Sequence, residues 1–343
     1  MPEGITVALD GFGAEQGFEV LAQGARAAAA DGIRLRVFGP AERLGLDGVE
    51  GIEVVPTLEW IGNDEDAVSS VRAKKEASVV LAAADVSEGR SAALVSHGST
   101  GATMAAATFG LRRLKGVQRP ALAVRLPVPG RPVLFLDVGA NVEVRAQHLV
   151  QFAFLGAAFS QAVLGVEQPR VGLLSVGEEA GKGREEVVAA NDALAAAKGI
   201  DFVGNVEGRD LPANAADVVV TDGFTGNVSL KLMEGTAKAM TGAIRDAARS
   251  NPLASIGGLL MRSALGGLRR ELHPDSTGGA ILLGLRGIAV VGHGSAGSDG
   301  IANAIRLAAR CVEVDAVGRT ASLLREGGAG RGALADRDEA DGA

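Results

Sequence analysis

The segment VGLLSVGEEAGKG (171–183) places an apolar run directly before a glycine-rich loop that contains one lysine, Lys182. Such a run followed by a glycine turn is typical of a buried strand in an α/β protein, with the loop at the strand's carboxyl end. A helical pattern over 184–198 follows, and then FVGNVEGRD (202–210) and DGFTGN (222–227). Because a lysine on a loop offers a mobile cation to a small anion or a developing oxyanion, we expect this loop to lie at the functional site.

The rest of the chain alternates strand-like and helix-like segments in the same way, which predicts an α/β fold. The predicted strands are the short apolar runs at 5–10, 33–38, 52–55, 92–95, 121–126, 133–138, 171–176, 216–222 and 287–292. We therefore expect one large α/β domain over 1–325. The remaining segment, 326–343, is rich in Gly, Ala and Asp, and we expect it to be disordered.

Composition excludes several classes of protein. The 343 residues are 47% apolar and 22% charged, as in an ordinary globular protein. A net charge of -7 and an aromatic content of 3% argue against nucleic-acid binding, which needs a basic surface and stacking side chains. One cysteine, Cys311, rules out an internal disulfide framework and indicates a reducing compartment.

The sequence also predicts where the protein resides. The first residues, MPEGITVALDG, lack the pattern of a signal peptide. The most hydrophobic stretch, 278–292, is interrupted by Arg286 and is too short to span a bilayer. We therefore expect a cytoplasmic protein.

Two further turns follow predicted strands and carry small and polar residues, SHGSTGATMAAATFGL (96–111) and DVGANVE (137–143). A turn of this kind before a helix presents N–H groups and hydroxyls to an anion, although ordinary helix caps are the alternative. In DGFTGN, Thr225 and Asn227 are candidate donors, with a plain N-cap as the alternative for each. His148 at the start of a predicted helix, 147–164, indicates capping or packing.

Two resemblances to catalytic motifs are weaker. GEEAGKG has three residues before its Gly-Lys pair where a P-loop has four, and Gly183 replaces the Ser or Thr that holds magnesium, so a nucleoside triphosphate is disfavoured. The pattern H-G-S-x-G, at 97–101 and 293–297, resembles a nucleophile elbow with histidine in place of its first glycine. A serine hydrolase or thioesterase is therefore an alternative, although no distinct strand-end Asp and His follow in the expected order.

The segment 250–272 combines apolar and basic residues in an otherwise acidic chain. It predicts a buried hairpin, a partner-binding face or a tip that touches an anionic membrane. The apolar residues expected at such a tip are Leu253, Ile256, Leu259 and Leu260. A non-catalytic, membrane-associated binding protein is therefore a second alternative.

Several strings in the same order resemble the PlsX-type phosphate acyltransferases, which in bacteria convert acyl carrier protein thioesters and inorganic phosphate into acyl phosphates for phospholipid synthesis. The strings are RPALAV (119–124), LDVGANV (136–142), HLVQFA (148–153), PRVGLL (169–174), GEEAGKG, FVGNVEGRD, DGFTGNVSLK (222–231) and NAIRLA (303–308). This chain departs from the family where GFGAE follows Asp10, where Ser99 replaces an amide, and where Arg184 replaces an Asn.

The resemblance implies a three-layer α/β/α sandwich like that of isocitrate and isopropylmalate dehydrogenases and of phosphate acetyltransferase. It also implies a homodimer formed through helices, with no cofactor and no metal. Peripheral association with the inner face of the membrane through 250–272 is implied as well, with a downstream glycerol-phosphate acyltransferase as a partner. By the same resemblance, Lys182 and Asn227 are the expected catalytic residues.

The implied reaction is phosphorolysis of a thioester, in which an anion approaches a carbonyl that itself becomes anionic. A positioned cation and neutral donors ease this step, so we assign charge stabilisation to Lys182 and orientation of phosphate or carbonyl to Asn227. Further candidate substrate contacts are Ser99, Thr100, Gly101, Asn141, Asn205, Arg209, Asp222, Thr225 and Gly226. An acidic carrier protein requires a basic surface, for which Arg112, Arg113, Lys115 and Arg119 compete with the arginines of 245–270.

Overall fold

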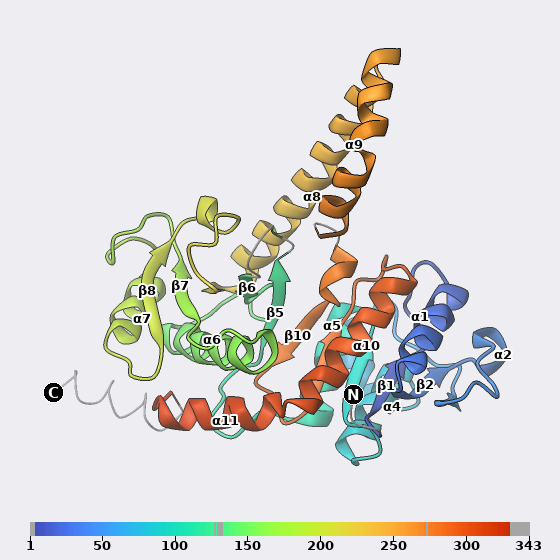
Figure 1. Cartoon of the computed structure of the whole chain (residues 1–343). Coiled ribbons are helices and arrows are strands. Elements are labelled where there is room, and N and C mark those ends of the chain that lie inside the picture. Colours follow the sequence, from blue (N-terminus) through green and yellow to red (C-terminus); the bar gives the residue numbers. More distant parts are fainter. Residues whose placement is uncertain (1–3, 127, 129–132, 272–273, 330–343) are drawn as a thin grey trace.

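The computed structural model describes residues 4–329, except 127, 129–132 and 272–273. Eleven strands among the described residues form one mixed sheet in the order β3-β2-β1-β4-β11-β10-β5-β6-β9-β7-β8 (Figure 1). The strands are β1 Thr6–Asp10, β2 Arg34–Gly39, β3 Ile52–Pro56, β4 Ala93–Ser96, β5 Ala121–Leu126, β6 Val133–Leu136, β7 Arg170–Leu174, β8 Asp201–Val206, β9 Val218–Val220, β10 Ala280–Leu283 and β11 Ile288–Val291.

The sheet consists of two parallel blocks joined by antiparallel pairs. Strands β3, β2, β1, β4 and β11 are parallel to one another, and so are β6, β9, β7 and β8. Between the blocks, β11, β10, β5 and β6 pair antiparallel. Because neighbouring parallel strands end at the same edge of a sheet, each block gathers its own loops.

Helices cover both faces of this sheet. They are α1 Phe18–Ala30, α2 Ala41–Leu44, α3 Ala67–Ala73, α4 Ser78–Ser87, α5 Thr100–Leu111, α6 Ala146–Phe159 with a π-helical turn at Ser160–Leu164, α7 Glu185–Ala195, α8 Gly223–Ala248, α9 Pro252–Glu271, α10 Ser298–Glu313 and α11 Ala316–Glu326. Single turns of 3-10 helix occupy Gly208–Asp210 and Pro274–Thr277.

The strands bury apolar side chains on both sides. In β1, Val7 and Leu9 belong to the core beneath α1, α6, α7, α10 and α11, whereas Ala8 belongs to the core beneath α3, α4 and α5. This alternation within a fully buried strand is expected when both faces of a sheet are covered. The three layers predicted from the sequence are therefore present.

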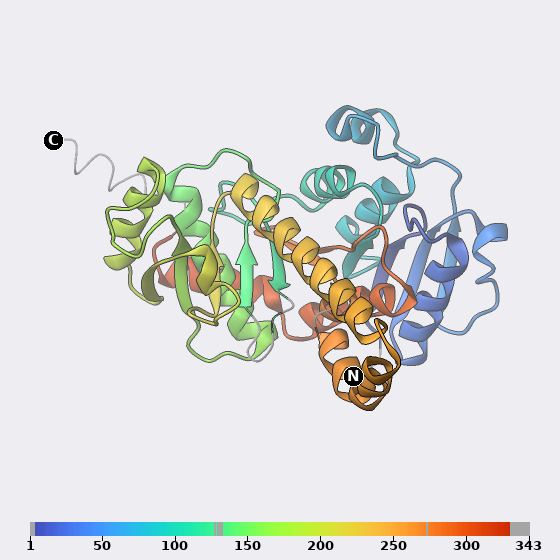
Figure 2. The same ribbon diagram turned by 90° about the horizontal axis from the view of Figure 1, so that it is seen from above.

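Helices α8 and α9 form a hairpin that projects from the body (Figure 1). Figure 2 shows α8 crossing the middle of the molecule before it meets α9. With 26 residues, α8 is about 39 Å long. Among the described residues, no helix combines the length and apolar character that crossing a membrane requires.

The chain after α11 departs from the prediction. Residues from 326 onward were expected to be disordered, yet Ala329 is buried and its carbonyl accepts a hydrogen bond of 2.9 Å from Nε2 of Gln151. A side chain at Gly327 would overlap the ring of Phe154. Residues 326–329 are therefore ordered, and the rest of the expected tail lies outside the described residues.

The first turn of α8 lies directly on the loop that follows β6. A Cβ atom on Gly226 would lie 1.8 Å from the carbonyl oxygen of Asp137, and one on Gly223 would lie 2.7 Å from that of Asn141. The main-chain N–H of Gly223 donates to the same Asn141 oxygen at 2.7 Å. Glycine is required at both positions because two backbones meet there without space for a side chain.

We predict that Gly226→Ala destabilises the protein by at least about 2 kcal/mol, because the added methyl group must displace α8 from the loop. Gly235→Ala in the same helix is the matched control, since nothing lies within 4 Å of a Cβ there. That change is expected to be neutral or stabilising by up to about 1 kcal/mol. Urea unfolding of both variants measures the difference, and equal midpoints would contradict the role given to Gly226.

Candidate active site

The loops after β6, β7, β8 and β9 form one group, which we call the lysine-side group. It comprises the loop 137–141, the lysine loop 177–183, the segment 205–210 and the start of α8 at 222–227. The four strands are adjacent and parallel, so their carboxyl ends meet at one edge of the sheet. The sequence placed most of its candidate residues here.

Asn205 and Ser175 hold the backbone of the lysine loop. Nδ2 of Asn205 donates to the carbonyl of Glu179 at 2.8 Å, and its Oδ1 accepts from Nδ2 of Asn191 at 2.9 Å. Ser175 Oγ donates to the carbonyl of Lys182 at 2.8 Å. The amide of Asn205, a predicted substrate contact, therefore positions the loop.

The side chain of Lys182 is exposed and makes no ion pair with any residue that the structure describes. The neighbouring Glu178 pairs instead with Arg209 at 3.0 Å. Arg209 also lies 3.2 Å from Glu207, and the hydrogen bond that it donates to Glu178 is the main reason that the pKa of Arg209 is raised. Arg209 thus pairs with Glu178 of the lysine loop, and the ammonium of Lys182 has no ion-pair partner among the described residues.

Asp222 caps α8, which corrects the cap assignment that the sequence offered for Thr225 and Asn227. Its Oδ1 accepts from the N–H of Thr225 at 2.9 Å, and its other oxygen pairs with Arg184. Burial opposes ionisation of Asp222, but the Thr225 hydrogen bonds and the Arg184 guanidinium leave its pKa below the usual value. Arg184, which directly follows the lysine loop, thereby ties that loop to α8.

Asp137, which the sequence analysis did not single out, organises the loop 137–141. Its carboxylate accepts from the N–H groups of Leu122, Gly139, Ala140 and Asn141 and from Nδ2 of Asn141. Burial raises the pKa of Asp137, and these five hydrogen bonds counteract that rise. The Asn141 amide also donates to the carbonyl of Pro120, so both of its protons are used within the protein.

Asn227 lies in the second turn of α8 and is exposed. Its Nδ2 would be 3.2 Å from a Cβ placed on Gly139, so the amide faces the loop 137–141. The N–H of Gly226 already donates to the carbonyl of Asp222 at 2.9 Å and is not a free donor in this structure. Of the candidates in this group, Lys182 and Asn227 are the exposed ones that remain for a substrate.

The other block of the sheet gathers a second set of loops, which we call the serine-side group. Asp10, at the end of β1, is buried and accepts from Ser78 Oγ at 2.6 Å and Ser96 Oγ at 2.7 Å. Burial raises the pKa of Asp10 despite these hydrogen bonds. Ser96 Oγ also accepts from the N–H of Gly98 at 3.1 Å, so this cluster fixes the start of the 97–101 turn.

The predicted anion contacts Ser99, Thr100 and Gly101 lie at the start of α5. Ser99 is the N-cap, and its Oγ accepts from the N–H of Ala102 at 3.4 Å. Thr100 is exposed, whereas a Cβ on Gly101 would lie 3.1 Å from Ala67 of α3. A helix N-terminus with an exposed hydroxyl residue is suited to an anion.

His97 does not form the serine–histidine pair that a hydrolase needs. It is 1% exposed, and neither ring nitrogen has a hydrogen-bond partner among the described residues. Burial, together with the nearby His293, lowers the pKa of His97 to about 4, so the ring is neutral at physiological pH. His293 does contact Ser295 Oγ at 2.7 Å, but this pair is two residues apart on the surface.

The two loop groups are well separated along the sheet. Four strand pairings lie between β4 and β6, and three of them are antiparallel, so the two parallel blocks run in opposite directions. A substrate that touches both groups must therefore reach from one block to the other. No cluster of three or more His, Cys, Asp or Glu suited to a metal occurs among the described residues.

The fold is that of an α/β protein, and its lysine-side group presents an exposed lysine and an exposed asparagine, an arrangement suited to an anion. A family model described as "Fatty acid synthesis protein" matches residues 5–319. The chain is 48% identical over 270 residues to a phosphate acyltransferase of Elusimicrobium minutum, covering 79% of each protein. It is 41% identical to that of Thermobifida fusca, covering 94% of this chain and 91% of the other.

This chain belongs to the phosphate acyltransferase family and is an acyltransferase. Solved structures share its fold at low identity. A phosphotransacetylase from Staphylococcus aureus superposes with a TM-score of 0.56 at 17% identity, covering 90% of this chain and 94% of the other. A branched-chain phosphotransacylase from Enterococcus faecalis gives 0.57 at 18% identity, with 90% and 99% covered.

We predict a pH-dependent loss of stability that originates at His97. A histidine whose pKa is about 4 when folded and about 6.5 when unfolded binds protons preferentially in the unfolded state. Stability is therefore lost as pH falls from about 6.5 and levels off below about 4. Between pH 7.5 and 5.0 the cost is about 2 kcal/mol.

Urea unfolding at both pH values measures this loss, with His97→Gln as the control that lacks the group. The variant is expected to lose about 2 kcal/mol less than the wild type. In the wild type, the ring-proton NMR resonance of His97 should not move between pH 7.5 and 5.0. A midpoint of titration near 6.5 would show that the ring is not held neutral.

Proposed function

We propose that this protein transfers the acyl group of an acyl carrier protein thioester to inorganic phosphate, giving acyl phosphate and free carrier protein for phospholipid synthesis. The observation that carries the proposal is the exposed ammonium of Lys182, which has no ion pair among the described residues and lies on a loop whose backbone is held by Asn205 and Ser175. The family and its phosphate acyltransferase relatives support it.

In the proposed reaction, one oxygen of hydrogen phosphate forms a bond to the thioester carbon and the C–S bond breaks. The proton of hydrogen phosphate passes to the departing thiolate, so no strong base is required. Lys182 stabilises the negative charge on the phosphate and on the carbonyl oxygen, which approach each other in the transition state. Asn227 orients phosphate or the carbonyl through its amide, and correct orientation lowers the barrier further.

The remaining candidates take two roles in this proposal. Asn141, Asn205, Asp222 and Gly226 position the loops, because their polar groups are already bonded within the protein. Ser99, Thr100 and Gly101 contact a phosphate or polar group of the substrate from the serine-side group. A thioester on the extended arm of a carrier protein is much longer than a phosphate ion, so we propose that it contacts both groups.

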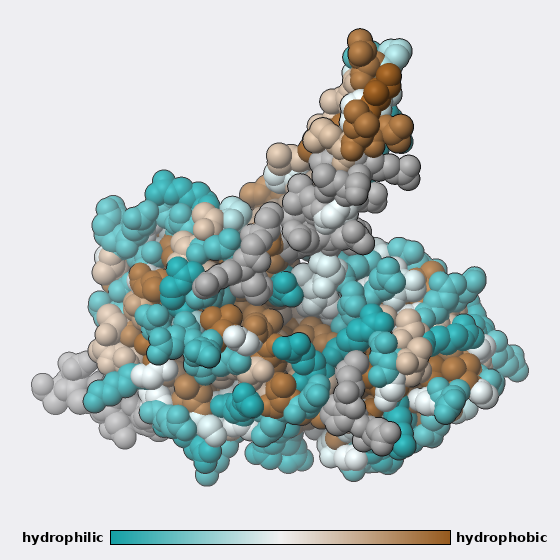
Figure 3. All heavy atoms as spheres, in the orientation of Figure 1, coloured by the Kyte–Doolittle hydropathy of each residue, from teal (hydrophilic) through white to brown (hydrophobic). Residues whose placement is uncertain are grey.

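The hairpin supports two further parts of the proposal. Along α8, Phe224, Val228 and Leu232 are exposed at four-residue intervals, so they form one stripe that spans about 80° of the helix surface. Met240 and Ile244 are also exposed, further round the helix. We propose that a second copy of the chain covers this stripe in a homodimer. Figure 3 shows hydrophobic residues gathered at the far end of the hairpin, where we propose contact with the inner face of the membrane and proximity to a glycerol-phosphate acyltransferase.

The residues predicted for the membrane tip are exposed as that role requires. Leu253 and Leu260 are 83% and 80% exposed, and Ile256 and Leu259 are also exposed. Arg245 and Arg249 lie nearby and are exposed, as suits an anionic lipid surface. The side chains of Arg262, Arg269 and Arg270 lie outside the described residues.

We predict that Lys182→Ala lowers turnover at least about tenfold, which is a barrier increase of about 1.4 kcal/mol, without unfolding the protein. Release of carrier-protein thiol with and without phosphate measures the reaction. Lys198→Ala, which removes an exposed lysine just beyond α7, is the control and should retain wild-type turnover.

The same assay separates the alternative functions. Thiol release by the wild type that is equally fast without phosphate would identify a thioesterase. No release at all would identify a binding protein without catalysis. Wild-type turnover in folded Lys182→Ala would remove the lysine from the mechanism.

For the hairpin, we predict that Leu260→Glu weakens binding to anionic lipid vesicles at least about tenfold. Burial of a leucine side chain in the lipid would contribute about 1.5–3 kcal/mol to the free energy of binding. Leu58→Glu is the matched control, since Leu58 is 82% exposed on the body of the protein. Both variants should sediment as dimers because the α8 stripe is unchanged. Equal vesicle binding by the two would contradict the tip, and a monomeric wild type would contradict the dimer.

A further inference from the structure

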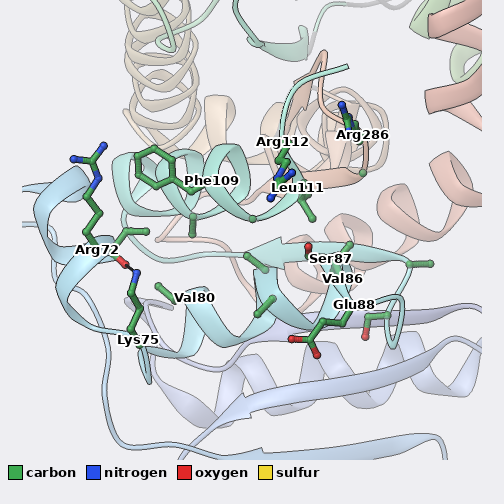
Figure 4. Close-up of a pocket in the computed structure, with 18 residues that line it drawn as sticks. Arg72, Lys75, Val80, Val86, Ser87, Glu88, Phe109, Leu111, Arg112 and Arg286 are labelled. Carbon is green, nitrogen blue, oxygen red and sulfur yellow. Dashed lines mark hydrogen bonds between the residues drawn. The ribbon is translucent and has the colours of Figure 1, made fainter. Parts of the chain in front are cut away.

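A groove with a volume of about 780 Å³ lies between α4 and the second half of α5 (Figure 4). The end of α3 closes one end of the groove, and the turn at Arg286 and Gly287 closes the other. Apolar residues of the two helices, among them Val80, Ala83 and Ala106, form its lining. The groove shares no residue with the candidate active site.

Both ends of the groove carry positive charge. Arg72 and Lys75 lie at the α3 end, and Arg112 and Arg286 lie at the opposite end (Figure 4). All four are exposed, and none makes an ion pair among the described residues. The acidic residue on the rim, Glu88, is already paired with Arg90. In a chain with a net charge of -7, this concentration of unpaired cations is a local positive surface.

An aromatic side chain stands beside the groove. Phe109 is 45% exposed, and the guanidinium of Arg72 lies 5.1 Å from the centre of its ring. Exposed aromatic and arginine side chains are those that most often carry the binding energy of protein interfaces. The groove thus offers an apolar anchor as well as charge.

We propose, as an extension of the proposed function, that this groove is the docking site for an acidic helix of the carrier protein. A lipid anion has one charged end and an apolar tail, and it would leave the cations at the second end unused. An acidic amphipathic helix matches charge at both ends with apolar contact between them.

The sequence left the arginines of 245–270 as the alternative site for carrier-protein binding, and the structure distinguishes them from this surface. Arg245 and Arg249 lie on a projecting helix beside exposed apolar side chains, which suits a lipid surface. Arg112 lies on a groove that holds both charge and an apolar lining. The basic surface continues beyond the groove through Arg113, Lys115 and Arg119, all of which are exposed.

Helix α5 links this docking site to the serine-side group. It begins at Thr100 in the serine-side group and ends at Leu111 in the groove, so about 18 Å separate its ends. A carrier protein bound in the groove would therefore hold its acyl thioester within reach of the α5 N-terminus.

The test removes one cation from each end of the groove in Lys75→Gln with Arg112→Gln. Neither side chain makes an ion pair among the described residues, so folding should be unaffected. We expect the double variant to bind unacylated carrier protein at least about tenfold more weakly by calorimetry, and to raise KM for the acylated carrier by a similar factor. Turnover of the small substrate acyl-coenzyme A should be unchanged.

The matched control is Arg34→Gln with Lys198→Gln, which removes two exposed cations elsewhere and should bind the carrier as the wild type does. Phosphate-dependent turnover with unchanged carrier binding in the groove variant would overturn the docking site alone. Weakened binding of fatty-acid anions, with carrier binding intact, would also overturn it and would make the groove a lipid site. A wild type that turns over neither thioester would refute the proposed function instead.

Discussion

The contact between the first turn of α8 and the backbone of the loop 137–141 holds the lysine-side group together. Gly226 allows the two backbones to touch, and Asp137 fixes the loop by accepting five hydrogen bonds. From the same turn of α8, Asp222 pairs with Arg184, which adjoins the lysine loop. One close packing contact therefore sets the relative positions of the helix with Asn227 and the loop with Lys182.

This arrangement explains why so few polar groups are left for a substrate. The amides of Asn141 and Asn205 are buried and bonded to the backbone, so they make the loops rigid and do not reach outward. Arg209 compensates the charge of Glu178, which would otherwise compete for the ammonium of Lys182. A loop that presents an exposed ammonium without an ion pair among the described residues is suited to an anion that must approach another developing negative charge.

The sequence predicted the α/β class and the lysine loop because both leave local patterns, namely apolar runs with glycine turns, whereas the three layers followed from the family resemblance. It could not predict pairs that join distant residues, such as Asp10 with Ser96 or Arg184 with Asp222, because no local pattern specifies them. Asp222 as the N-cap of α8 could have been predicted, since an Asp before a helical pattern is a preferred N-cap. The strand order could not be predicted from the sequence, and it places the candidates near Ser99 and the Lys182 loop in different blocks of the sheet.

Helix α8 relates the site to the hairpin in a fixed way. Asn227 lies in its second turn, and the hairpin tip follows the far end of the same helix, about 39 Å from its start. Because backbone hydrogen bonds hold every turn of the helix, α8 keeps the site and the hairpin tip at a fixed distance from each other. On the proposed function, the tip can therefore touch lipid while the site remains in water, where phosphate and the carrier protein reach it. The product must then cross only the length of the helix to enter the bilayer.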